Sequence, residues 1–352
     1  SEMCIRDSST KYVSLNSKYT GEASILAILM MIFGVAILLL NQISVKSRKS
    51  YTTVTGKSGQ ISKFNLGRSG KYIIAIILII ITFFTSIFPI VSFAFETFLP
   101  NPGDYSFLYT GDPDNLTTKW WVTNENITEN GMYGQQGILY NDMIWHAYKG
   151  TIMVSVCCAL TAGTIGTLIG YAVSKNRRSR WANYVNSMAF LPYLMPSIAV
   201  GVAFFILFSN KYVNLFNTYA LLIIVGTVKY IPFASRSSLN SMLQLSGEIE
   251  EAAIIQDIPW TKRMTRIIIP IQKTSIISGY LLPFMTCLRE LSLFILLCVQ
   301  GFILSTTLDY FDEMGLYAFS SGINLILIVT ILICNALVNK ATGASLDKGI
   351  GG

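Results

Sequence analysis

The sequence predicts an all-α membrane protein, a polytopic helical bundle, and three observations lead to this fold class. Hydrophobic residues make up 52% of the 352 residues, and the mean hydropathy is +0.52. Charged residues make up only 13%, whereas soluble globular proteins carry about 25%. Several apolar runs are also about 20 residues long, enough to cross a hydrocarbon core of about 30 Å.

Each of seven apolar runs is expected to form one transmembrane helix, giving about seven in all. The fourth contains Pro192 and Pro196. In one interpretation these prolines, with Pro232 of the fifth run, kink the spans so that they bend around a pathway. In the other, they are ordinary prolines, which membrane helices tolerate when neighbouring groups satisfy the freed backbone. In chain order the runs cover residues 23–43, 72–95, 150–174, 184–209, 218–234, 274–299 and 316–338.

Basic residues are concentrated in alternate connections between these runs. Cytoplasmic loops of membrane proteins carry an excess of Lys and Arg. The N-terminus is therefore expected outside and the C-terminus in the cytoplasm. The same distribution accounts for the net charge of +7, so nucleic-acid binding is not expected. The basic connections are 44–71, 175–183 and 236–273, and those poor in Lys and Arg are 96–149, 210–217 and 300–315.

A charged stretch, residues 248–270, separates the fifth and sixth runs. Pro259 favours a break after a first short helix, since an interior proline removes a backbone hydrogen bond. Asp257 adopts the left-handed conformation of a turn more readily than most residues. The stretch therefore predicts a helix–turn–helix, against the alternative of an ordinary amphipathic interfacial helix. Its patterned residues are Glu251, Ala252, Ala253, Asp257, Ile267, Ile269 and Pro270.

This spacing resembles the EAA loop of ABC-importer permeases, E-A-A-x3-G-x9-I-x-L-P. Asp257 stands where that family has Gly, and Ile269 where it has Leu. The resemblance covers about residues 72–340, is nearest to the iron(III)-type subfamily of binding-protein-dependent permeases, and implies a MetI-like permease core. Supporting stretches lie at 50–57, 191–196, 231–236 and 288–292.

The resemblance implies a transport subunit of the bacterial inner (plasma) membrane that is not an enzyme and has no catalytic residues. The loop would dock cytoplasmic ABC ATPase subunits, which hydrolyse ATP, and transmit their closure to the spans. A periplasmic substrate-binding protein would deliver iron(III) to the outer face, where the acidic connection 96–149 would assist docking. Glu251 is expected to pair with Arg263 or Arg266. The apolar faces of the loop are expected to come from Ile254, Ile255, Trp260 and Met264.

Permeases of this subfamily are often two similar halves fused in one chain. Residues 1–71 are accordingly expected to be a fragment start, with the last helix of a missing first half and a basic cytoplasmic linker. Residues 72–340 would form the permease domain and 341–352 a cytoplasmic tail. A second permease half, fused or separate, is the expected partner within the lipid bilayer.

No cofactor or metal site is expected. The sequence has one His and six Cys, and five of the Cys lie in apolar runs, where they are typical small buried hydrophobes. The dipeptide Gly56-Lys57 resembles the end of a phosphate loop, but Tyr51 occupies the position that needs a glycine. ATP binding is therefore expected in a separate chain.

Arg289 and Glu290 are adjacent charges expected inside the sixth span. An ion at the bilayer centre costs about 2.5–3.5 kcal/mol, so such groups face protein or a water-filled path. In one interpretation this pair lines or gates the translocation path. In the other, each residue forms a structural ion pair with a different span, because adjacent helix residues point about 100° apart.

Three glycines of the third run, Gly163, Gly166 and Gly170, share one side of the predicted helix. Small residues at this spacing let membrane helices approach closely. Tight helix contact is therefore expected there, rather than a ligand site.

Three alternatives compete with this interpretation. Within transport, the same architecture could carry thiamine, polyamine or sulfate. An ion-coupled secondary transporter would show inverted repeats and several mid-membrane acids, whereas Glu290 is the only acid clearly inside a predicted span. A membrane enzyme would need a catalytic cluster, and the sequence has neither paired acids in a span nor metal-ligand spacing.

Overall fold

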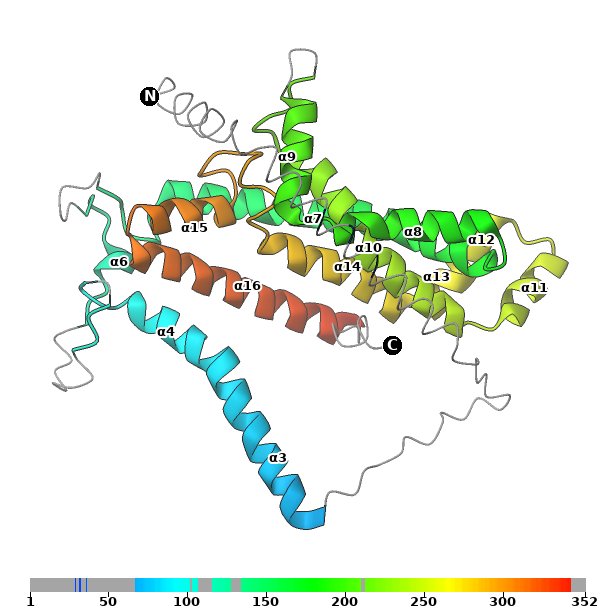
Figure 1. The fold of residues 1–352 in the computed structure, drawn as a ribbon, viewed down its shortest axis with the longest axis horizontal. Coiled ribbons are helices and arrows are strands. Elements are labelled where there is room, and N and C mark those ends of the chain that lie inside the picture. Colours follow the sequence, from blue (N-terminus) through cyan, green and yellow to red (C-terminus); the bar gives the residue numbers. More distant parts are fainter. Residues whose placement is uncertain are drawn as a thin grey trace. The chain divides into compact units, whose positions relative to one another are not determined.

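The structure is a computed structural model in which nearly all regular structure is helical (Figure 1). Across the described residues it has no strand beyond two isolated β-bridges, which confirms the all-α fold class. The predicted first span, 23–43, lies outside the described residues except at three helical positions. The described residues are 29, 32, 36, 67–101, 103–106, 116–127, 134–209 and 213–342.

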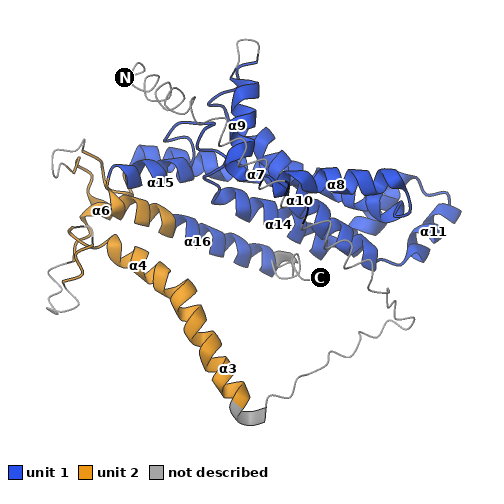
Figure 2. Ribbon diagram, in the orientation of Figure 1, with its two compact units in different colours: residues 1–32, 141–314, 326–352 blue, residues 33–140, 315–325 orange. Residues whose placement is uncertain are grey.

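The chain divides into two compact units (Figure 2). The first unit comprises residues 1–32, 141–314 and 326–352, and the second comprises 33–140 and 315–325. Helix α16, Tyr317–Thr342, has its first residues in the second unit and the rest in the first.

The second unit contains the helix predicted at 72–95. Helices α3 (Gly67–Thr82) and α4 (Phe88–Glu96) are joined by a π-helical turn, η1 (Phe83–Ile87). Pro89 lies in the first turn of α4, where its missing N–H is tolerated, and the wider π turn precedes it. The apolar side chains of α3 are exposed, a pattern that is typical of a membrane-spanning helix.

The same unit closes around a buried tryptophan. Trp120, in the short helix α6 (Lys119–Val122), donates a hydrogen bond from Nε1 to the carbonyl of Leu99 at 2.7 Å. Its ring meets Phe319 edge to face, with centroids 5.8 Å apart. A buried tryptophan whose N–H is satisfied in this way fixes the connection between α4 and α6.

The first unit is built around three helices that pack on one another: α7 (Asp142–Lys175), α10 (Tyr219–Gln244) and α14 (Lys273–Leu288) (Figure 1). The first two begin at side-chain caps: Asn141 accepts from an N–H of α7, and Thr218 from one of α10. These caps satisfy backbone donors that no helix can satisfy at its own N-terminus.

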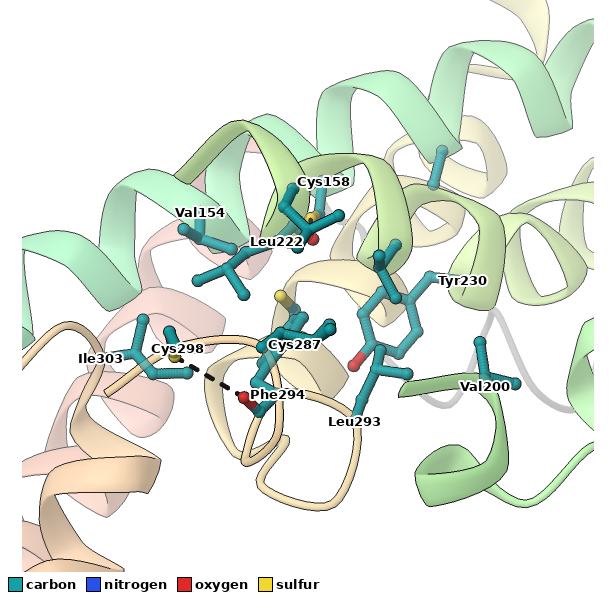
Figure 3. Packing of buried hydrophobic residues seen from close by; sticks show 14 residues of the cluster. Val154, Cys158, Val200, Leu222, Tyr230, Cys287, Leu293, Phe294, Cys298 and Ile303 are labelled. Carbon is teal, nitrogen blue, oxygen red and sulfur yellow. Dashed lines mark hydrogen bonds between the residues drawn. The ribbon is translucent and has the colours of Figure 1, made fainter. Parts of the chain in front are cut away.

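The core of this unit is a cluster of buried apolar side chains between α7, α10 and the segment after α14. Cys158 and Leu222 contribute to it from α7 and α10, and Tyr230 lies in the same cluster as Leu293 and Phe294 (Figure 3). The sulfur of Cys158 lies 3.8 Å from the carbonyl of Leu222. The cysteines therefore pack as small hydrophobic residues here.

Close helix contact through the α7 glycines is present as predicted. A Cβ added at Gly166 would lie 2.5 Å from the Cβ of Ala234 and 2.7 Å from the backbone nitrogen of Ser235 on α10. At Gly170 the nearest atom is the backbone nitrogen of Leu239, also at 2.7 Å. Both glycines let the α7 and α10 backbones approach closely.

The fourth predicted span is not one straight helix, which corrects the expectation for 184–209. Helix α8 (Arg180–Leu194) and helix α9 (Ser197–Phe208) meet at an angle of 99°. Met195 between them is extended, with ψ 133. A residue that precedes a proline is pushed out of the helical region, so Pro196 accounts for the break.

The sixth predicted span is also wrong in its second half. Helix α14 ends at Leu288, and residues 289–303 are irregular until α15 (Leu304–Glu313) begins. Arg289 and Glu290 thus follow the helix instead of lying within it. At the other end of α14, the helices over Trp260–Ile271 meet it at 86°.

Among the described residues, four helices are long and apolar enough to cross a membrane, or up to six segments if each bent pair is one span. The four are Gly70–Glu96, Asp142–Lys175, Tyr219–Gln244 and Tyr317–Lys340.

The packing of α7 on α10 predicts that Gly166→Ala destabilises the protein, because the new methyl group meets backbone atoms that cannot rotate away. We expect a loss of about 1–3 kcal/mol in unfolding free energy, as is usual for overpacking. The measurement is thermal unfolding of the purified protein in detergent. Gly247→Ala is the matched control, since the only atom within 4 Å of its added Cβ is Glu251 Oε1, at 3.7 Å. An equal Tm for the two variants would contradict the close contact.

Candidate functional site

The charged stretch 248–270 folds as a helix–turn–helix. Its first helix, α11 (Gly247–Ile255), is capped by Ser246, whose hydroxyl accepts from the N–H of Glu248 at 3.4 Å. Pro259 caps the second limb, which runs as α12 (Trp260–Arg263), a π turn η3 (Met264–Ile268) and α13 (Ile269–Ile271). We call this element, 247–271, the coupling loop.

The turn of the coupling loop is closed by backbone hydrogen bonds around Asp257. Asp257 is left-handed, with φ +52. The N–H of Ile258 donates to the carbonyl of Ala253 at 3.1 Å, and the N–H of Asp257 donates to Ile254 at 2.9 Å. This pair of bonds is the Schellman pattern, in which glycine is the usual left-handed residue. The left-handed conformation is less unfavourable for aspartate than for most other residues, so the turn keeps its shape without glycine.

A buried carboxylate, Glu250, connects the coupling loop to α7. Its side chain is ion-paired with Lys175 at the end of α7 and accepts a hydrogen bond from the hydroxyl of Tyr171 at 2.5 Å. Arg263 Nε in the second limb lies 3.9 Å from the same carboxylate. Arg263 also donates to the carbonyl of Ile258 at 3.0 Å, which ties the second limb to the turn.

The charge of Glu250 is maintained by these partners. Burial disfavours the ionised carboxylate, but the hydrogen bonds from Lys175 and Tyr171 and the charges of Lys175 and Arg263 outweigh it and lower the pKa of Glu250. The carboxylate is therefore ionised at neutral pH. Glu250 on α11 is thus joined to partners on α7 and α12, and a buried carboxylate paired in this way holds the three helices in one arrangement.

The second limb is anchored by apolar contacts. Met264 and Ile268 are buried and pack with Met242 of α10 and Ile276 of α14. Trp260 lies next to Tyr171 of α7, with ring centroids 6.3 Å apart. The coupling loop thus contacts all three central helices of the first unit.

Apolar side chains on both sides of the turn, in contrast, are exposed. Ile255 is 85% exposed, Ile254 is 52% exposed and Trp260 is 43% exposed. Scattered exposed hydrophobic residues are normal, but three at one tip, beside charged residues, are typical of a surface that binds another protein.

The structure places one predicted loop residue differently from the expectation. Glu251 is exposed, and Glu250 instead makes the pairing with Arg263. This difference follows from helix phase, because α11 turns the 250 and 253 positions inward and their neighbours point to solvent. Of the four predicted apolar side chains, Met264 is buried in the bundle, whereas Ile254, Ile255 and Trp260 are exposed. The remaining positions are Ala252 and Pro270, exposed, Ala253, buried, and Ile267, half-buried.

A second set of polar contacts, inside the bundle, stabilises the backbone at the break between α8 and α9. Lys229 of α10 is buried, and its ammonium group donates to the carbonyls of Pro192 at 3.0 Å and Met195 at 2.6 Å. These are carbonyls at the C-terminal end of α8, which lack partners within the helix. Backbone exposed by a break inside a membrane needs such partners.

The next residue of α10, Tyr230, holds the irregular segment after α14. Its hydroxyl donates to Glu290 at 3.0 Å, and the same carboxylate accepts from the N–H of Leu293 at 3.2 Å. Ser305 of α15 donates to the backbone carbonyl of Glu290 at 2.7 Å. Glu290 is therefore a local cap of the irregular segment.

The two breaks lie against each other. A Cβ added at Gly201 of α9 would lie 2.7 Å from the carbonyl oxygen of Leu293, so α9 packs on the backbone of the segment 289–303. Of the two predicted path residues, Glu290 is engaged as described, whereas Arg289 is exposed. The sequence analysis missed Lys229, although a lysine within an apolar run was a visible signal.

Comparison with known proteins agrees with this geometry. Residues 162–344 match the family described as binding-protein-dependent transport system inner membrane component. FbpB 1 of Haemophilus influenzae, a protein named for ferric transport, is 24% identical over 288 residues, which cover 81% of this chain and 42% of that protein. The chain thus spans about two fifths of the length of this relative. The putrescine transport system permease PotI of Escherichia coli is 26% identical over 204 residues, 55% of this chain and 68% of PotI.

The fold is also shared with a solved structure. The chain superposes with a TM-score of 0.55 on a chain of a bacterial alginate ABC transporter in complex with its alginate-bound periplasmic protein. The match covers 78% of this chain and 96% of that chain, at 15% sequence identity. Identity this low supports the fold alone.

The buried pairing predicts that Glu250→Gln loosens the coupling loop, whereas Glu251→Gln does not. Glutamine keeps the shape but removes the charge that Lys175 and Arg263 share. We expect a loss of about 1–2 kcal/mol, below the usual cost of breaking a buried pair because Lys175 is 36% exposed. Hydrogen exchange of the 247–271 amides measures the loosening. Equal exchange in the two variants would contradict the structure.

The left-handed turn predicts that Asp257→Gly stabilises the coupling loop. Glycine adopts positive φ without a steric cost, so a gain of about 0.5–1 kcal/mol is expected. The same exchange measurement would show slower opening of α11, and Gln256→Gly, at a position with φ −84, is the control in which no gain is expected. Faster exchange in Asp257→Gly would mean that the aspartate side chain contributes more than its backbone strain costs.

Proposed function

We propose, on the premise that this chain belongs to the family of binding-protein-dependent transport system inner membrane components, that it is the membrane-spanning permease subunit of an ABC importer. The observation that carries the proposal is the coupling loop: an anchored helix–turn–helix whose tip exposes Ile254, Ile255 and Trp260. The subunit has no chemistry of its own, and a partner ATPase supplies the energy.

The coupling loop is suited to docking an ATPase subunit because it combines an apolar tip with a rigid base. Ile255, at the end of α11, would enter an apolar groove of the partner. Buried apolar anchors usually provide most of the binding energy at protein interfaces. The Glu250–Lys175 pairing would then pass a displacement of the tip to α7, and the packing of Met264 and Ile268 would pass it to α10 and α14.

For the cargo we propose iron(III). The relative FbpB 1 is named for ferric transport and matches across 81% of this chain. PotI, named for putrescine transport, matches a shorter part, so a polyamine is the second candidate. Thiamine and sulfate complete the alternatives for the same architecture. An ion-coupled secondary transporter is disfavoured because it has no use for a docking loop of this kind.

The remaining parts of the assembly are proposed from the family. A periplasmic binding protein would deliver cargo to the outer side, near the acidic connection 96–149. A second permease half, fused or separate, would complete the path. Residues 72–340 would be the permease domain, preceded by the basic linker and followed by the tail 341–352. The positive-inside distribution then puts the coupling loop and the C-terminus in the cytoplasm and the N-terminus outside.

The docking proposal predicts that Ile255→Asp weakens association with the partner ATPase at least tenfold, because it places a charge where an apolar anchor is buried. Co-purification of the ATPase with tagged permease measures the association. Gln256→Asp, at the adjacent exposed position, is the matched control and should retain the partner. Retained association and normal transport in Ile255→Asp would contradict docking through this tip.

A further inference from the structure

Four ionisable side chains lie deep in the spanning part of the first unit. Lys229 and Arg236 lie ten and seventeen residues after Tyr219, about 15 Å and about 26 Å along α10. Arg289 and Glu290 follow directly after α14, about 24 Å from its start. All four positions lie within about 30 Å, the thickness of a bilayer core, of the helix start from which they are measured, so the group lies within the spanning part.

The group carries a net charge of +2, because it contains three basic side chains and one carboxylate. Dipoles satisfy some of these charges: Lys229 donates to two carbonyls, and the guanidinium of Arg236 lies 4.4 Å from the centroid of the Phe190 ring. None of the three basic residues forms an ion pair with an acidic residue in the described part of the chain. The positive excess is therefore not cancelled locally.

Arg289 is the exposed member of the group. It forms no hydrogen bond or ion pair with a described residue, and Ser292, three positions later, is exposed beside it. A charged side chain in contact with lipid at this depth is costly, and so is irregular backbone. Irregular backbone is tolerated where it is buried in protein or lines a water-filled cavity, and an exposed charge where it faces such a cavity. Broken elements of this kind form the cargo sites of many transporters.

We propose that the junction of the α8–α9 break with the segment 289–303 is a water-lined, positively charged section of the translocation path, and that it selects cargo carrying negatively charged oxygens. The inference rests on the proposed permease function and adds the substrate class to it. Lys229 and Tyr230 hold the two breaks together, and Arg289 presents its guanidinium to the path. Arginine and lysine in a pore favour anions in the same way.

The proposal restricts the candidate cargoes by charge. Iron(III) would cross as a complex whose anionic oxygen ligands outweigh the charge of the metal. An oxyanion such as sulfate fits the same electrostatics. Thiamine and polyamines are cations, and a path with a net charge of +2 opposes them. The chemistry shared by the two favoured classes is a negatively charged oxygen surface.

Thiol labelling tests the charge of this section whatever cargo the transporter carries. Ser292→Cys is introduced in the full-length chain, with Cys157 and Cys334 replaced by alanine because both are partly exposed. The assembled transporter in membranes is treated with an anionic (sulfonatoethyl) and a cationic (trimethylammonioethyl) methanethiosulfonate. Each rate is divided by the rate of that reagent with free 2-mercaptoethanol, and the ratio of the anionic to the cationic value is the readout.

The expected ratio is well above one, and adding Arg289→Gln should lower it about five- to tenfold. A unit charge acting across about 7 Å of water would produce this change, because it acts in opposite directions on the two reagents. Lys273→Gln, an exposed lysine at the far end of α14, is the control and should leave the ratio unchanged. A ratio that Arg289→Gln does not change, or no reaction with either reagent, would overturn the proposal.

Uptake by the assembled transporter distinguishes the possible cargoes. Transport of radiolabelled ferric citrate or of radiolabelled sulfate supports the proposal and identifies which anionic class is carried. Transport of radiolabelled putrescine overturns it. ATPase co-purification is scored separately, so a failure of docking is distinguishable from a failure of charge selection. If none of the three compounds is taken up, the labelling ratio alone decides whether this section of the path is positively charged.

Discussion

The ion pairing of Glu250 is the constraint on which the coupling loop depends. A carboxylate that is 5% exposed would destabilise the protein unless it is paired, and here Lys175, Tyr171 and Arg263 meet it from α7 and from the second limb of the loop. Removing any one partner leaves the others incompletely satisfied. The helix–turn–helix is therefore attached to α7 in a single geometry. In this geometry its apolar tip points away from the bundle. A docking element needs this combination, because a flexible tip would absorb a displacement without passing it on.

Helix α10 provides a comparable constraint within the membrane. Its adjacent residues Lys229 and Tyr230 satisfy the polar groups that two broken elements leave open, the carbonyls at the end of α8 and the carboxylate of Glu290. Without Lys229, the carbonyls at the end of α8 would lose these hydrogen bonds, and without Tyr230 the carboxylate of Glu290 would lose one. Both losses would occur at a depth where water is scarce. The same residues bring both breaks to one place. The irregular geometry is thus compatible with the membrane because one regular helix supports it.

Features that single residues determine can be predicted from the sequence, whereas features that depend on distant contacts cannot. The turn at Asp257 and Pro259, and the close contact at Gly166, follow from the properties of single residues and could be predicted. The inward position of Glu250 in place of Glu251 could not, because it depends on the phase of α11 against α7. The break after Leu288 could not be predicted either, since the apolar run continues through it, and the break after Leu194 has Pro196 as its only local signal. Their stabilising contacts come from α10, far away in the sequence.

The central claim is that the coupling loop docks a partner ATPase through its apolar tip while Glu250 holds its base. A cryo-EM structure of the assembled transporter tests this most directly. The account predicts that Ile255, 85% exposed in the isolated chain, is buried in a groove of the ATPase. It also predicts that the Glu250–Lys175 pairing remains intact. An ATPase bound elsewhere, with Ile255 still in solvent, would contradict the account, and so would a docked loop in which Glu250 has left Lys175.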